Sequence, residues 1–322
     1  MLKKVMVIVL VLAALVGGLV VMLKQVGSEM GDEMPEGAVL RVVTTSTMVT
    51  DMVKTIGGER VFVHGIMGPG VDPHSYQVVS SDSVALRKAD LVFYSGLHLE
   101  GKMQDALDKR AEKQHDAFAV TDGIPEGELL KPQDQFAGYH DPHVWGDPSI
   151  WVHCIDVVVK ELSAADPEGA EGYKQRADAY RDELLALHAW VLKRVAEVPE
   201  SQRVLVTSHD AFFYFGKAFG FEVRGLQGVS TNSESGLKDR SELVEFIKSR
   251  ELKMIFPESS VNAKGIKAVA SEAGVGVSEH ELFSDAMGDP DDTVELHGET
   301  YDKGRYTGMI KHNVNTVVDG LK

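Results

Sequence analysis

The sequence is poor in cysteine and in positive charge, and both shortages exclude classes of function. Cys154 is the single cysteine among 322 residues, so an intramolecular disulfide is impossible and a thiolate-rich zinc or copper(I) site is excluded. Lysine and arginine number 33 against 49 aspartates and glutamates. The resulting net charge of −16 argues against a nucleic-acid partner and is compatible with a cationic ligand.

The N-terminus carries a long apolar run. Residues 5–23 are uncharged and would span roughly 28 Å as a helix, close to the thickness of a bilayer core. Lys3 and Lys4 precede the run, which favours a cytoplasmic N-terminus and an exported remainder. A cleaved signal peptide usually has a shorter apolar core, and no cysteine follows here to carry a lipid. We therefore favour an uncleaved membrane anchor over a cleaved signal, with anchor and tether occupying residues 1–38.

The rest of the chain alternates between short β-rich runs, such as VLRVVTT and RVLVTSH, and helical stretches, which is typical of a parallel α/β sheet. Its length suggests about two domains. A long segment without internal proline interrupts the alternation, and its apolar residues recur at helical spacing. The predicted fold is α/β, with two parallel-sheet lobes at residues 39–165 and 200–322. A single long rigid helix at residues 166–199 connects them.

Three helix boundaries follow from local sequence. Asp147 before Pro148 predicts an N-cap, and Asp166 before Pro167 predicts the same at the start of the long helix. A last helix is expected over about residues 293–321.

Three histidines and one aspartate follow strands or lie in glycine- and proline-rich loops. They are His74 in GPGVDPHSYQ, His143 in YHDPHVWGDP, His209 at the end of RVLVTSH, and Asp285 in ELFSDAMG. Ligands of open α/β sheets bind beyond the carboxyl ends of strands, and this donor set suits a divalent cation such as zinc or manganese. Each residue also has an ordinary explanation, such as a turn, a helix cap or, for His143, packing against Trp145. Spacing alone therefore leaves the ligand set open.

The order of several motifs resembles one protein family. GPGVDPHSYQVVSSDSVALRKADLVFYSGLHLE, DPHVWGDP, TSHDAFFYFGKAFGFEVRGLQGVSTNSESG, PESSVNAK and LFSDAMG follow one another as in the zinc/manganese solute-binding proteins of bacterial ABC importers. The resemblance covers residues 39–322. It implies two α/β lobes joined by one long helix, with a metal ion bound between them. The family's four ligand positions fall on His74, His143, His209 and Asp285.

Two departures from the family bear on the identity of the metal. Members with glutamate at the third ligand position are usually manganese binders, whereas this chain has His209. Many zinc-specific members carry a histidine-rich loop before the second ligand, but residues 121–141 contain only His140. The GLQGVSTNSESG run resembles the branch that handles zinc and manganese, and sometimes iron. The expected ligand is one Zn²⁺ or Mn²⁺ per chain, with the choice open.

The resemblance implies capture of the metal and its delivery to an ABC permease, not catalysis. Four protein ligands leave no open position for an activated water, and affinity is expected to fall as pH drops through about 6.5. Glu258 and Asp210 are candidates to orient the imidazoles. The alternatives are a metallohydrolase, with Asp285 or Glu258 as base, and a surface adhesin with a structural metal. We expect an extracytoplasmic monomer, tethered to the cytoplasmic membrane or released after cleavage, that binds no nucleic acid.

Overall fold

The computed structural model describes residues 34–131, 138–232 and 235–322. They form the α/β fold with parallel strands that the alternating pattern predicts. The predicted apolar segment at residues 5–23 lies outside the described residues. Within the described ranges, every helix is too short or too polar to cross a membrane.

The first half of the chain builds a four-stranded parallel sheet in the order β2-β1-β3-β4. Its strands are β1 (Leu40–Thr44), β2 (Val61–Gly65), β3 (Leu91–Tyr94) and β4 (Ala117–Ala119). The two central strands, β1 and β3, are buried along their whole length, as expected for a sheet covered on both faces. The helices of this half are α2 (Thr47–Gly57), α3 (Ser80–Lys88), α4 (Gln104–Gln114) and α6 (Cys154–Ala165).

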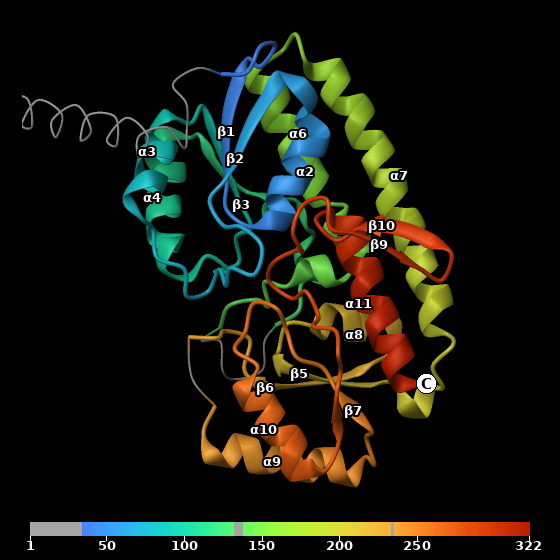
Figure 1. The fold of residues 1–322 in the computed structure, drawn as a ribbon. Helices are drawn as coiled ribbons and strands as arrows, with labels where there is room; N and C mark the ends of the chain where they lie inside the picture. Colours follow the sequence, from blue (N-terminus) through green and yellow to red (C-terminus); the bar gives the residue numbers. More distant parts are fainter. Residues whose placement is uncertain (1–33, 132–137, 233–234) are drawn as a thin grey trace, which may run out of the picture.

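The second half holds shorter parallel strands. They are β5 (Val204–His209) paired with β6 (Glu222–Gln227), and β7 (Met254–Ile255) paired with β8 (Gly276–Val277). The backbone N–H of Phe256 donates to the carbonyl of Val206 at 2.9 Å, which joins the two pairs. The helices here are α8 (Phe213–Phe219), α9 (Leu237–Ser249) and α10 (Lys264–Ala273). Figure 1 shows β6, β7, α9 and α10 toward the opposite end of the molecule from β1, β2 and β3, with α8 nearer the middle.

Helix α7 (Ala170–Val195) has 26 residues and carries the apolar stripe that the spacing predicts. The members of that stripe are all buried: Tyr173, Ala177, Tyr180, Leu184, Leu187, Val191 and Val195. The helix packs against α2 and α6 beside the first sheet and, further along, against α8 and the last helix, α11 (Tyr306–Leu321). Figure 1 shows it running along the side of the molecule past both groups of strands. The domain boundaries at 165/166 and 199/200 stay a prediction.

Between the first sheet and residue 144, the described residues 120–131 and 138–143 contain little regular structure. Single 3-10 turns lie at Val120–Gly123, Glu126–Glu128 and Val144–Gly146. The N-cap predicted at Asp147 is confirmed, because its carboxylate accepts from the backbone N–H of Ser149 at 2.9 Å, at the start of α5 (Pro148–Trp151).

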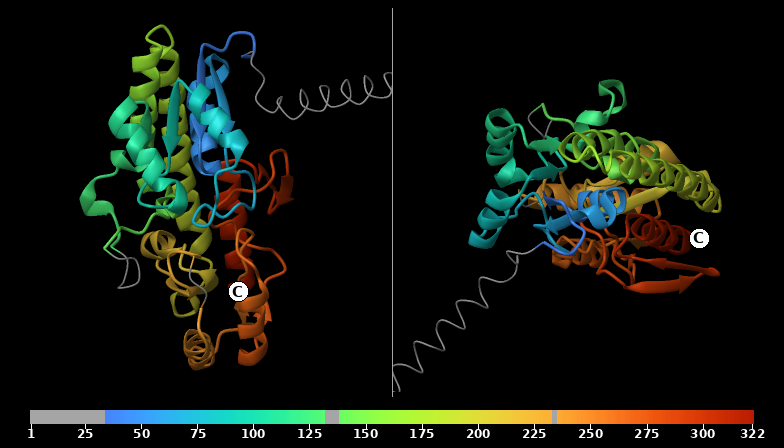
Figure 2. Two further views of the ribbon diagram at one scale, coloured as in Figure 1. Left: turned by 90° about the vertical axis from the view of Figure 1, so that its left-hand side faces the viewer. Right: turned by 90° about the horizontal axis from the view of Figure 1, so that it is seen from above.

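The helix expected over residues 293–321 is wrong in its first third. Residues there form an antiparallel hairpin of β9 (Thr293–Leu296) and β10 (Glu299–Asp302), and α11 (Tyr306–Leu321) begins only after it. The two connecting residues, His297 and Gly298, both have positive φ, at 53° and 77°, as a two-residue hairpin turn requires. Figure 2 shows the hairpin beside α11 at the edge of the molecule.

The cap predicted at Asp166 is also wrong. Helix α7 begins after Gly169, which makes no side-chain cap. The Asp166 carboxylate instead accepts two hydrogen bonds from Arg60, at 2.7 and 2.8 Å, and one from the hydroxyl of Tyr173 at 2.6 Å. A bidentate, charge-assisted pair outweighs a capping bond. It ties the end of α6 to the start of β2, and it lowers the pKa of Asp166 to about 2.

Asp166→Asn should therefore destabilise the protein in a pH-dependent way. A depressed folded-state pKa stabilises the fold above the unfolded pKa of about 4, and this contribution is lost as pH falls from about 4 to 2. We expect a loss of about 1–2 kcal/mol at pH 7, after allowing for solvent beside Arg60. Urea denaturation at pH 7 and pH 3, with the exposed Asp178→Asn as control, measures it. An equal difference at both pH values would contradict the ion pair as its cause.

Candidate metal centre

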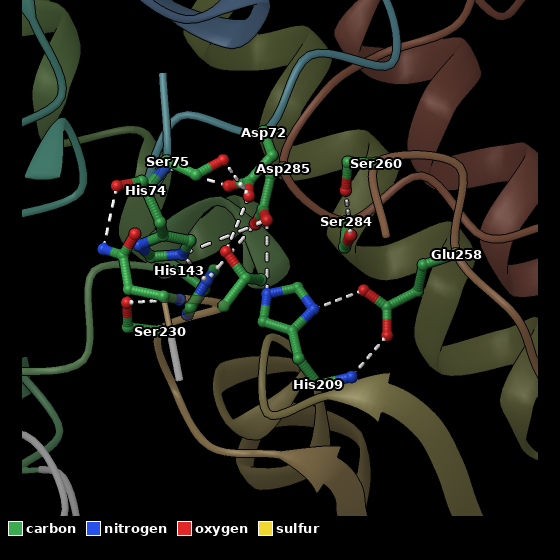
Figure 3. A network of polar contacts seen from close by, with 12 residues as sticks. Asp72, His74, Ser75, His143, His209, Ser230, Glu258, Ser260, Ser284 and Asp285 are labelled. Carbon is green, nitrogen blue, oxygen red and sulfur yellow. Dashed lines mark hydrogen bonds and ion pairs between the residues drawn. The ribbon is translucent and has the colours of Figure 1, made fainter. Parts of the chain in front are cut away.

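The four residues singled out in the sequence come together in one buried cluster. His74, His143, His209 and Asp285 each offer one donor atom, and these atoms all lie within 4.8 Å of one another. None of the four side chains is more than 1% exposed. His74 follows β2, His209 ends β5, and the other two lie in loops far apart in the sequence. Figure 3 shows the imidazoles converging on the carboxylate of Asp285.

The Nε2 atoms face the centre of the cluster. His209 Nε2 lies 3.2 Å from Asp285 Oδ2, His143 Nε2 lies 3.3 Å from Asp285 Oδ1, and His74 Nε2 lies 3.9 Å from Asp285 Oδ2. Yet His209 Nε2 and both Asp285 oxygens are buried without a well-formed hydrogen bond. Unsatisfied buried polar atoms are costly, and a cation at the centre would satisfy them all. The donors therefore fit a divalent metal ion.

Two of the histidines are presented by the same three-residue motif, Asp-Pro-His. The backbone N–H of His74 donates to Asp72 Oδ1 at 2.9 Å, and that of His143 donates to Asp141 Oδ1 at 2.9 Å. The aspartate thus closes a tight turn across the rigid proline, which holds the histidine main chain in place.

The aspartates of the two motifs then differ. Asp141 also accepts from His143 Nδ1 at 2.8 Å, whereas Asp72 binds the hydroxyls of Ser75 and Thr231 at 2.7 and 2.6 Å. The orienting role of Asp141 was missed in the sequence analysis. The repeated Asp-Pro-His motif is the sequence signal that could have identified it.

The orienting role expected of Glu258 is confirmed. Its two oxygens accept the backbone N–H of His209, at 2.9 Å, and the Nδ1–H of the same residue. Because a carboxylate only accepts, Nδ1 donates its proton to Glu258, and Nε2 is left as the ring nitrogen that faces the cluster centre. The same expectation for Asp210 is wrong, since its carboxylate accepts from the backbone N–H of Gly225 at 2.7 Å. At the end of β5, His209 therefore faces Glu258 and the cluster, whereas the carboxylate of the next residue, Asp210, faces Gly225.

The buried carboxylates stabilise positive charge at the cluster centre. His74 is the exception, because burial outweighs the nearby carboxylates and lowers its pKa to about 4. Burial opposes charge on His143 as well, but Asp141 and Asp285 raise its pKa to about 9. For Asp285, burial raises the pKa, yet His209 and His143 hold it well below its usual range. The cluster is therefore built for a cation.

Contacts between distant segments close the cluster from several sides. Asn232 Nδ2 donates to the carbonyl of His74 at 2.9 Å, and Trp145 Nε1 donates to the carbonyl of Ser284 at 2.8 Å. The backbone N–H of Met287 donates to the hydroxyl of Thr47 at 2.9 Å. Segments from both halves of the chain thus fix the loops that carry His74, His143 and Asp285.

Known proteins are similar to this chain in sequence and fold. Residues 42–320 match the family described as zinc-uptake complex component A, periplasmic. The chain is 42% identical over 287 residues to the manganese-binding lipoprotein MntA of Bacillus subtilis, covering 88% of this chain and 90% of that protein. It is 41% identical over 284 residues to the zinc-binding protein TroA of Treponema pallidum, covering 87% and 88%. The solved structure of periplasmic TroA matches with a TM-score of 0.81 at 41% identity, over 88% of this chain and 99% of that chain.

Glu258→Gln should weaken metal binding while leaving the fold intact. The amide cannot accept both donors of His209, so the ring loses the bond that aims its Nε2 atom. Loss of such an orienting partner typically costs about 10- to 100-fold in metal affinity. Competition for Zn²⁺ against a chelator measures the loss, and the exposed Glu279→Gln serves as control. Unchanged affinity in Glu258→Gln would contradict the orienting role.

Proposed function

The chain belongs to the zinc-uptake complex component A family, and on that premise we propose that it is a metal carrier. It captures one divalent transition-metal ion, zinc or manganese, and delivers it to the permease of an ABC importer. His74, His143, His209 and Asp285 are the proposed ligands. The convergence of these four buried donor atoms within 4.8 Å is the observation that carries the proposal.

The arrangement favours capture over catalysis. Four protein donors complete the coordination of a tetrahedral ion, so no position is left for an activated water. The two bases considered for a metallohydrolase are also engaged. Both oxygens of Glu258 accept hydrogen bonds from His209, and Asp285 lies among three imidazoles. A carrier needs only a closed site that can open to the permease.

The choice between zinc and manganese rests on donor chemistry and relatives. Three imidazole nitrogens and one carboxylate oxygen favour zinc by the Irving–Williams order, whereas a bidentate carboxylate would suit manganese. The relatives named above are a manganese-binding and a zinc-binding protein. A dual zinc and manganese role agrees with both.

The proposed architecture has two lobes, at residues 39–165 and 200–322, joined by a rigid connecting helix at 166–199. The length of α7 and its packing against helices of both halves support this. A stiff connector predicts small lobe movements rather than wide hinge closure. The protein is proposed to act as an extracytoplasmic monomer without a nucleic-acid partner. Residues 1–38 would tether it to the membrane beside its permease or be removed after export; the relative from Bacillus subtilis is named a lipoprotein.

Titration of the metal-free full chain with Zn²⁺ should reveal one tightly bound ion per chain, because the four donors define one site. Equilibrium dialysis with elemental analysis gives the stoichiometry, and a parallel assay with ester and peptide substrates should show no turnover. Metal-dependent hydrolysis would favour the metallohydrolase, and metal-dependent stability without exchangeable metal would favour the adhesin. Absence of stoichiometric binding would overturn the four-ligand assignment.

His209→Glu should narrow the preference for zinc over manganese. Replacing one imidazole nitrogen by a carboxylate oxygen makes the donor set harder, which suits manganese better than zinc. Competition between the two metals measures the affinity ratio, with the exposed His280→Glu as a matched control. A ratio equal to that of the unmodified protein would show that residue 209 does not select the metal.

A further inference from the structure

Glu100 is a fully buried carboxylate outside the four-donor cluster. Its Oε1 accepts from the hydroxyl of Thr45 at 2.7 Å and from the backbone N–H of Ser95 at 2.6 Å, and its Oε2 accepts from the backbone N–H of Gly96 at 3.1 Å. Thr45 directly follows β1 and Ser95 directly follows β3. One side chain therefore joins the carboxyl ends of the two central strands of the first sheet.

The segment that Glu100 holds follows an unusual backbone path. Gly96, Leu97, His98 and Gly101 all have positive φ, at 89°, 53°, 64° and 37°. Left-handed conformations are unfavourable for leucine and histidine, so surrounding contacts must impose this path. The hydrogen bond from the backbone N–H of Gly96 to Glu100 lies at the start of the left-handed run.

Gly101 brings this segment against the main chain of His74. A Cβ atom at position 101 would lie 2.2 Å from the carbonyl oxygen of His74 and 3.3 Å from its Cα. The same carbonyl accepts from Asn232, and the N–H of His74 donates to Asp72. The backbone of His74 is therefore confined on one side by the segment and on others by these hydrogen bonds. A shift of the segment would displace the His74 imidazole with its backbone.

We propose that Glu100 is a positioning residue for the bound metal. Its carboxylate holds residues 95–101 in the path that places Gly101 against His74, and this sets His74 Nε2 at the cluster centre. The inference rests on the proposed function, because it assigns a second layer of support to one ligand of the same site.

A positioning role and a merely structural role predict different couplings. A structural role would weaken the whole protein, whichever ligands are present. A positioning role acts through His74 alone, so replacing Glu100 should not change the metal affinity once the His74 imidazole is removed. A double-mutant cycle separates the two, because only interacting residues give non-additive losses.

The test uses the full chain carrying Glu100→Gln, alone and combined with His74→Ala or with His209→Ala. The NH2 group of the glutamine would face groups that donate hydrogen bonds to Glu100, so residues 95–101 should lose part of their support and shift. Zn²⁺ affinity, measured by chelator competition, should fall about tenfold in the single variant. It should fall again by a similar factor in the His209→Ala background, but change less than twofold in the His74→Ala background. Glu112→Gln, exposed on α4, is the control.

Visible absorption of bound Co²⁺ provides a readout that stability does not move. The Glu100→Gln spectrum should approach that of His74→Ala, which has one imidazole fewer. Equal affinity losses in all backgrounds, or none, would overturn the positioning role while leaving one-ion binding by the unmodified chain intact. Failure of the unmodified chain to bind would overturn the proposed function itself. If Glu100→Gln does not fold, Thr45→Val replaces it, because it removes the hydroxyl that donates to Glu100 Oε1 and should show a weaker form of the same coupling.

Discussion

The imidazoles of His74, His143 and His209 are buried around the carboxylate of Asp285. The rest of the structure depends on stabilising this buried group of polar side chains. Burial alone would oppose charge on His143 and His209, yet Asp285 together with Asp141 and Glu258 reverses that preference. Asp141 and Glu258 also fix the rings of His143 and His209 by accepting from their Nδ1 atoms. A site with this much buried negative charge is stable only when a cation, as protons or as a metal ion, compensates it.

The architecture supplies this site through the ends of its parallel strands. His209 is the last residue of β5, and Glu100 joins the ends of β1 and β3 beneath the loop of His74. Parallel strands bring their carboxyl ends to one edge, where loops from distant parts of the sequence can meet. Helix α7 packs against helices of both halves, α2 and α6 in the first and α8 and α11 in the second. A buried site of four converging donors suits a protein that holds an ion and releases it to a partner.

Much of this could be predicted from the sequence. Alternating β-rich and helical runs predicted the α/β fold, and the apolar spacing predicted all seven buried positions of the α7 stripe. The four cluster residues were recognisable because each lies in a short motif at a strand end or in a constrained loop. Spacing alone did not distinguish the three cluster histidines from the other nine of the twelve, and only the order of the motifs, shared with a family, singled out all four residues.

Local sequence by itself determined most of the elements, because helix periodicity, strand alternation and the N-cap at Asp147 depend on residues a few positions apart. It did not predict the hairpin of β9 and β10, which replaces the first part of the expected last helix. Only the tertiary structure decided the partners. Asp166 pairs with Arg60 instead of capping a helix, and Asp141 accepts from the His143 ring and so orients it. The carboxylate of Asp210 binds the backbone of Gly225 instead of an imidazole of the cluster. A carboxylate binds whichever donors the folded chain brings within about 3 Å. For side chains dozens of residues apart, that proximity is a property of how the loops cross, which no local pattern encodes.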